Sequence, residues 1–124
     1  MWLCFNDGFL SVVNDQSDPS KLMVRARRRE ALFDILGNDA EVVESAGADY
    51  RWRAFINREA FASMVASRIT EIGYVNFKNS VPDAELHRLY MDFWQLHRQY
   101  QERDNPLRSS RDRARKPRES RELQ

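Results

Sequence analysis

Cysteine and histidine are scarce in this 124-residue chain, which contains one cysteine, Cys4, and two histidines. A single cysteine excludes an internal disulfide, and three such side chains are too few for a structural zinc site with the usual four ligands. The histidines, His87 and His97, lie ten residues apart on one predicted helix. That spacing is about 15 Å along the helix axis, so they cannot share a metal. We therefore expect neither a metal nor a cofactor.

Long apolar runs and glycine-rich loops are also missing. No stretch approaches the roughly 20 apolar residues of a membrane-spanning helix. The first residues, M-W-L-C-F-N-D-G, lack the basic and apolar segments of a secretion signal. The four glycines occur singly, so no glycine-rich phosphate-binding loop is present. These absences predict a cytoplasmic protein without membrane association and argue against a nucleotide-dependent enzyme.

Charge is distributed unevenly along the chain, although the net charge is only +1. Residues 105–124 contain 7 basic and 3 acidic side chains, a net charge of +4, whereas the preceding residues contain 13 basic and 16 acidic ones, a net charge of −3. The last segment also has two prolines and few apolar residues, so it cannot offset its chain entropy by burial. We expect a single domain over residues 1–104 and a basic disordered tail over 105–124.

Alternating apolar and polar residues predict an antiparallel sheet. The strand patterns lie at residues 2–5, 9–13, 22–27, 41–44 and 49–56. Asn6, Asp7 and Gly8 predict a tight hairpin between the first two strands, because these residues tolerate the positive φ that such loops use. Helical patterns lie at residues 28–36, 57–73 and about 81–103. The order β-β-β-α-β-β-α-α predicts an α+β fold, with helices packed on one face of a sheet of about five strands.

Several segments carry a resemblance to known sequences. They are M-W-L-C-F-N-D-G-F-L-S-V-V, L-M-V-R-A-R-R, A-D-Y-R-W-R-A, Y-V-N-F-K-N-S-V and L-H-R-L-Y-M-D-F-W. Together they resemble a family of small uncharacterised bacterial proteins, and the resemblance extends to about residue 100 without the tail. It implies a single-domain intracellular protein of bacterial or phage-borne origin, and it implies no catalytic residues.

Four arginines form the clearest pattern for a binding site. Arg25 and Arg27 share one face of the third predicted strand, and Arg51 and Arg53 share one face of the fifth. If the two strands are neighbours, four guanidinium groups line one sheet surface, where each can bind a phosphate or carboxylate through paired hydrogen bonds. The simpler alternative is a solvated face whose arginines pair with nearby acids. These acids are Glu41, Glu44 and Asp49.

The final predicted helix offers a second candidate surface. Met91 and Trp94 lie off its main apolar line, and Met, Trp and Arg are enriched at protein interfaces. The competing interpretation is that the helix is buried over more than half of its circumference.

The loop before this helix is a third candidate. Its S-V-P-D segment matches a capping box with Ser80 as the N-cap, and we expect Tyr74 and Phe77 to pack at the corner. An anion would bind just ahead of the helix, where amide groups are unpaired. The polar candidates for that role are Asn76, Lys78 and Asn79. A purely structural corner is the simpler interpretation.

The absence of a catalytic motif favours a non-enzymatic binding or accessory protein that engages a protein partner through the arginine-bearing sheet face or the final helix. A phage-borne inhibitor of a host system fits this size. Nucleic-acid binding through the four arginines and the tail is an alternative, which the acidic body of the chain disfavours. A small enzyme or ligand binder is another, in which Cys4 or a histidine meets the loop from Tyr74 to Ser80. A homo-oligomer is also left open.

Overall fold

The computed structural model describes residues 1–104, and the predicted disordered tail at 105–124 lies outside the described residues. The chain divides into two units, one from Met1 to Arg88 and a second that begins at Leu89. The single domain predicted over residues 1–104 stays a prediction. None of the helices in the described part combines the length and hydropathy that crossing a membrane requires.

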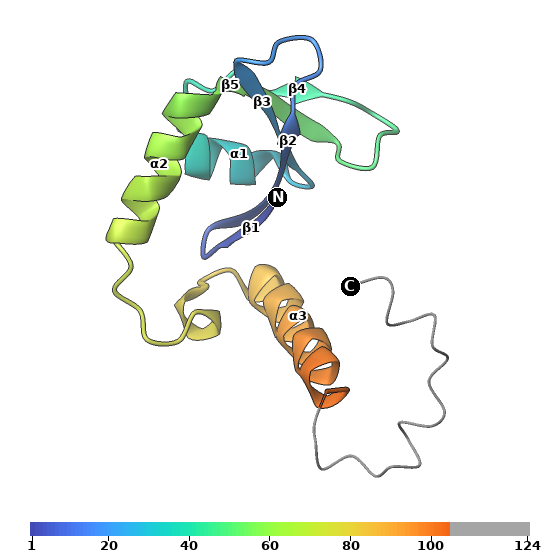
Figure 1. The fold of residues 1–124 in the computed structure, drawn as a ribbon, viewed down its shortest axis with the longest axis vertical. Helices are drawn as coiled ribbons and strands as arrows, with labels where there is room; N and C mark the ends of the chain where they lie inside the picture. Colours follow the sequence, from blue (N-terminus) through green and yellow to red (C-terminus); the bar gives the residue numbers. More distant parts are fainter. Residues whose placement is uncertain (105–124) are drawn as a thin grey trace. The chain divides into compact units, whose positions relative to one another are not determined.

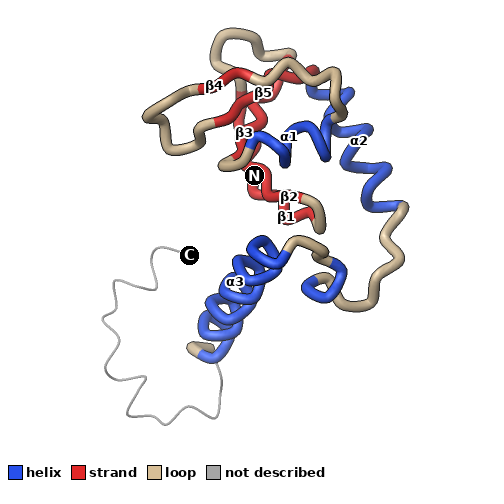
Figure 2. The backbone as a smooth tube through the Cα atoms, turned by 180° about the vertical axis from the view of Figure 1, so that it is seen from behind, coloured by secondary structure: helices blue, strands red, loops and turns tan. Residues whose placement is uncertain are grey.

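Five antiparallel strands form one sheet in the first unit (Figure 1). They are β1 (Trp2–Phe5), β2 (Gly8–Asn14), β3 (Lys21–Ala26), β4 (Val43–Glu44) and β5 (Trp52–Asn57). Their spatial order is β1-β2-β3-β5-β4, which can be followed in Figure 2. The predicted α+β fold with a sheet of about five strands is confirmed, and β3 and β5 are neighbours.

Three helices and one short turn complete the described chain. They are α1 (Arg29–Leu36), α2 (Arg58–Thr70), the 3-10 turn η1 (Lys78–Ser80) and α3 (Ala84–Glu102). Asn57 is the N-cap of α2, because its side chain accepts hydrogen bonds from the amides of Glu59 and Ala60. This capping satisfies two of the amides that a helix start leaves unpaired.

Helices α1 and α2 cover one face of the sheet, as predicted for the helices of this fold. The buried core joins side chains of that face to side chains of both helices. Its members are Leu10, Val12, Val24, Ala26, Ala31, Leu32, Ile35 and Phe61. Burying each Leu, Ile or Val side chain stabilises the fold by about 1.5–3 kcal/mol. In the first unit neither helix covers the opposite face of the sheet.

The β1–β2 turn uses its glycine differently from the prediction. Phe5 pairs with Gly8, so Asn6 and Asp7 form a two-residue loop, but no residue of this turn has a positive φ. Gly8 is required for space instead, because an added Cβ would lie 2.9 Å from the Cβ of Ala31 on α1. The predicted hairpin is therefore confirmed, but the predicted reason for its turn residues, a positive φ, is wrong.

An arginine on α2 holds this turn in place. Arg68 donates from its two terminal nitrogens to both carboxylate oxygens of Asp7, at 2.6 and 2.9 Å, and its guanidinium carbon lies 4.8 Å from the ring centre of Phe5. Hydrogen bonds between charged groups in such paired geometry are stronger than neutral ones. The contact joins the C-terminal part of α2 to the β1–β2 hairpin.

The predicted capping box at Ser80 is wrong. Val81 has an extended backbone with ψ of 109°, because the ring of Pro82 disfavours a helical conformation for the residue before it. Helix α3 consequently begins after Asp83, whose Oδ2 accepts from the amide of Leu86 at 2.9 Å. Asp83 is the N-cap, and Ser80 belongs to the preceding 3-10 turn.

Candidate functional site on the open sheet face

The face of the sheet opposite α1 and α2 carries two of the four predicted arginines, Arg25 and Arg53. Strand register places Arg25 on β3 directly opposite Arg53 on β5, with Ser11 of β2 on the other side of Arg25. We call this surface the open face. It comprises Trp2, Cys4, Phe9, Ser11, Val13, Met23, Arg25, Arg53 and Phe55, which share one side of the sheet by strand alternation and pairing.

The guanidinium group of Arg25 is held in a fixed position. One terminal nitrogen donates to the Oγ of Ser11 at 2.7 Å, and the guanidinium carbon lies 4.6 Å from the ring centre of Tyr50. Both Ser11 and Tyr50 are buried. The Nε of Arg25 is also buried, and it has no hydrogen-bond partner among residues 1–104. A buried donor without a partner costs about 1–3 kcal/mol of folding free energy.

Arg53 has weaker contacts. Its Nε lies 3.5 Å from the carbonyl oxygen of Tyr50, and one terminal nitrogen lies 3.3 Å from the sulfur of Met23. Neither Arg25 nor Arg53 forms an ion pair with a carboxylate of the described residues. Two cations thus stand opposite each other without neutralisation.

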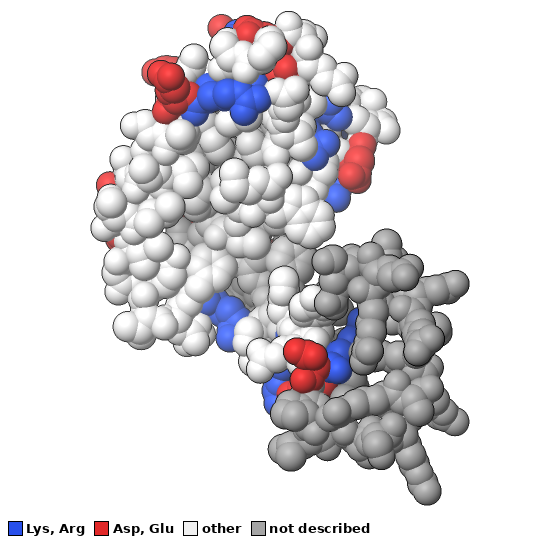
Figure 3. Space-filling view, in the orientation of Figure 1, with Lys and Arg blue, Asp and Glu red and all other residues white. Residues whose placement is uncertain are grey.

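The other two predicted arginines are ion-paired. Arg27 lies 3.1 Å from an oxygen of Asp49, and Arg51 donates to one oxygen of Glu44 at 2.6 and 2.8 Å. The alternative of a solvated face with ion-paired arginines therefore holds for Arg27, which follows β3, and for Arg51, which precedes β5. On the face drawn in Figure 3, basic and acidic side chains adjoin at several places, which is the ordinary pattern for a protein surface.

Apolar side chains flank the arginine pair on the open face. Trp2 is 68% exposed and Phe55 is 44% exposed, and the ring of Trp2 meets the ring of Phe9 edge to face at 5.8 Å. The sequence patterns had assigned no binding role to these residues or to Tyr50. The sequence does contain a signal for apolar residues on this face, because Met23 and Phe55 alternate in phase with Arg25 and Arg53 along the same two strands.

Met91 and Trp94 lie on α3, in the unit that begins at Leu89. Both side chains are exposed, and the guanidinium carbon of Arg98 lies 5.6 Å from the ring centre of Trp94. Tyr90 is the one buried residue among those described on α3. The predicted interface residues are thus accessible, and most of this helix is exposed.

The three predicted anion ligands lie in and around the 3-10 turn, where internal hydrogen bonds use the side chain of Asn76 and backbone groups of Lys78 and Asn79. Asn76 accepts from the amide of Asn79 at 3.1 Å. The Nδ1 of His87 lies 2.7 Å from the carbonyl oxygen of Lys78, which can only accept, so Nδ1 is the donor. The start of α3 is capped by the carboxylate of Asp83, which disfavours a second negative group there.

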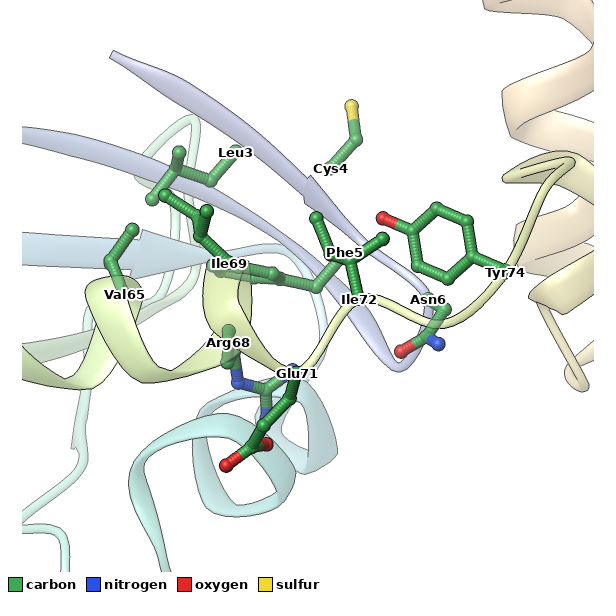
Figure 4. A pocket seen from close by; sticks show the side chains of 10 residues that line it. All are labelled: Leu3, Cys4, Phe5, Asn6, Val65, Arg68, Ile69, Glu71, Ile72 and Tyr74. Carbon is green, nitrogen blue, oxygen red and sulfur yellow. The ribbon is translucent and has the colours of Figure 1, made fainter.

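A pocket of about 470 Å³ lies between β1 and the C-terminal end of α2 (Figure 4). Its lining residues are Leu3, Cys4, Phe5, Asn6, Val65, Arg68, Ile69, Glu71, Ile72 and Tyr74. Cys4 and Tyr74 are both among the lining residues, and no histidine lines the pocket. The ligand-binder alternative stays a prediction. Burial raises the pKa of the Cys4 thiol, which keeps it protonated at neutral pH and weakens it as a nucleophile.

No family model, no curated protein and no solved structure matches this chain. The resemblance to small bacterial proteins and the role of a phage-borne inhibitor stay predictions. Geometry and charge on the open face carry the functional argument.

Proposed function

We propose that this chain is a non-enzymatic binding protein whose open face binds an acidic segment of a protein partner. The observation that carries the proposal is the pair of opposed arginines, Arg25 and Arg53, which have no carboxylate partner among the described residues. Like charges directly across two strands destabilise a sheet. An acidic partner would turn that cost into a favourable interaction.

The surroundings of the pair support this function. The stacking of Arg25 on Tyr50 and its bond to Ser11 fix the guanidinium before any partner arrives, so less side-chain entropy is lost on binding. Exposed Trp2 and Phe55 add apolar contact area beside the charges. Tryptophan and arginine are the residue types that most often dominate binding energy in protein interfaces.

A charge-matched pair of variants tests the proposal. The double variant Arg25→Gln with Arg53→Gln removes the two cations that have no carboxylate partner. The control, Arg27→Gln with Arg51→Gln, removes the same number of ion-paired cations next to the same two strands. We expect nuclease-treated lysate from the source cells to yield a partner with the wild type and the second variant, and not with the first. Equal capture by both variants would contradict the proposal.

Single-stranded nucleic acid is a second candidate ligand, favoured by the exposed rings of Trp2 and Phe55 next to the two arginines. Aromatic side chains on an open sheet stack with unpaired bases, and arginines contact the phosphates. Titration of a thymidine oligonucleotide, followed by tryptophan fluorescence, tests this. Two neutralised phosphates predict a slope of about −1.4 in a plot of log K against log salt concentration. A titration without saturable binding at low salt would exclude this candidate.

A further inference from the structure

The outer edge of β1 is unpaired, since β1 is the last strand on one side of the sheet. The terminal amine and carbonyl of Met1 bond the carbonyl and amide of Val12, at 2.7 and 2.8 Å. Bonded pairs alternate in an antiparallel ladder, so Leu3 is the next residue of β1 bonded to β2. The peptide groups of Trp2 and Cys4 therefore point outward, and no described residue bonds them.

Strand β1 has none of the sequence or pairing features that usually block strand addition. Native sheets protect their edges with lysine, proline, bulges or a covering element. The sequence of β1 is W-L-C-F, which has no charge and no proline, and its pairing with β2 runs without a bulge. The edge can therefore accept a further strand.

A groove of mixed polarity lies next to β1, formed by the pocket between β1 and α2. Figure 4 shows Leu3 and Phe5 directed toward Ile69, whereas the side chain of Cys4 points to the other side of β1. Ile69 is 61% exposed and Ile72 is 51% exposed, although both are large aliphatic residues. A side chain that entered the groove would cover them.

The charged groups of the groove define which peptide it fits. Arg68 is paired with Asp7, so its charge is compensated. The carboxylate of Glu71 has no hydrogen bond or ion pair with any residue of 1–104. The hydrogen bond with Asp7 raises the pKa of Arg68, and the charge of Glu71 also acts electrostatically on Arg68 to raise it. The charges of Asp7, Arg68 and Glu71 together leave a net negative charge beside aliphatic side chains, which suits a peptide that carries a basic residue.

We propose that this groove binds an extended segment of a partner protein by strand addition to β1. The segment bonds the outward peptide groups of Trp2 and Cys4, inserts an apolar side chain against Ile69 and Ile72, and places a lysine or arginine near Glu71. Backbone pairing supplies affinity in this mode, and alternate side chains supply specificity. The site is separate from the open-face arginines, so either proposal can fail without the other.

Selection of random heptapeptides displayed on phage, against the full chain, tests this binding mode. We expect selected peptides to alternate apolar residues and to contain a basic one. Their binding should slow hydrogen exchange at the amides of Trp2 and Cys4. Methylating the peptide nitrogens that face β1 should weaken binding at least about tenfold. Failure to select any peptide, or binding without protection of these two amides, would overturn the proposal.

Three substitutions locate the site. Ile69→Asp and, independently, Ile72→Asp should each weaken peptide binding at least about tenfold, and both positions are exposed enough to leave the fold intact. Leu96→Asp on α3 makes the same kind of change at a comparable exposure of 60% and should leave binding unchanged. Unchanged binding by both isoleucine variants would refute the assignment. The variant with Arg25 and Arg53 replaced by Gln should bind these peptides normally.

Discussion

Replacing Arg53 with threonine should stabilise the protein, because it relieves a charge repulsion and removes only weak interactions. Arg53 faces Arg25 directly across β3 and β5, and like charges in this position cost about 0.2–1 kcal/mol. The substitution removes one hydrogen bond of 3.5 Å to Tyr50 and one interaction with the sulfur of Met23. Threonine also suits a strand. We expect a gain of about 0.5 kcal/mol, which raises the unfolding midpoint by about 2–4 °C.

Thermal unfolding followed by circular dichroism measures this gain. The electrostatic screening length falls from about 10 Å at 0.1 M salt to about 3 Å at 1 M. The gain in the free energy of unfolding should therefore be smaller at high salt. Arg51→Thr is the matched control: it removes an exposed ion pair with Glu44 and should lower the free energy of unfolding by about 0–1 kcal/mol. A destabilised Arg53→Thr protein, or a gain that is equal at both salt concentrations, would refute the argument from repulsion.

Four further predictions concern the hairpin and its thiol. Gly8→Ala should lower the free energy of unfolding by about 1–3 kcal/mol in urea titrations, because the new Cβ meets α1 at 2.9 Å. Gly73→Ala, where a Cβ has no atom within 4 Å, should change it by less than about 0.5 kcal/mol, and equal effects of the two would contradict this reasoning. Arg68→Met should lower the free energy of unfolding by about 1–3 kcal/mol, because it removes the ion pair with Asp7. Adding Asp7→Asn to this variant should lower the free energy of unfolding little further. Additive losses would instead show that the two side chains act independently. Burial raises the pKa of Cys4 from its ordinary 9.0, so iodoacetamide should modify it more slowly at pH 8 than it modifies free cysteine. The unfolded thiol ionises at a lower pH than the folded one, so stability should fall as pH rises above about 9, and Cys4→Ala should lose this dependence.

Local signals predicted most of the secondary structure. The N-cap at Asn57 and the stop of α1 at Gly37, whose φ is 98°, depend on neighbouring backbone groups, and both are readable from a few residues. The error at Ser80 came from a competition between two local signals. Ser80 and Asp83 match the sequence pattern of a capping box, but Pro82 disfavours a helical backbone at Val81, so the helix does not begin at Ser80.

Part of the candidate site, the side of the sheet on which its arginines lie, was also predictable from local sequence. Strand alternation correctly placed Arg25 and Arg53 on the face opposite the core, because side-chain direction follows from a period of two residues. It could not show that these two lack acidic partners while Arg27 and Arg51 have them, since ion pairing depends on loop conformation. It also gave no reason for Gly8 to be glycine beyond the turn itself.

The sequence alone determined the α+β class, the hairpins, the helix positions and the two-faced character of the strands, because each depends on residues close in the chain. Only the tertiary structure decided that β3 pairs with β5, that Arg25 stands opposite Arg53, and that β1 forms an edge beside a groove with exposed aliphatic side chains. Those features join segments far apart in sequence. Their geometry is set by register and packing, which local periodicity does not encode.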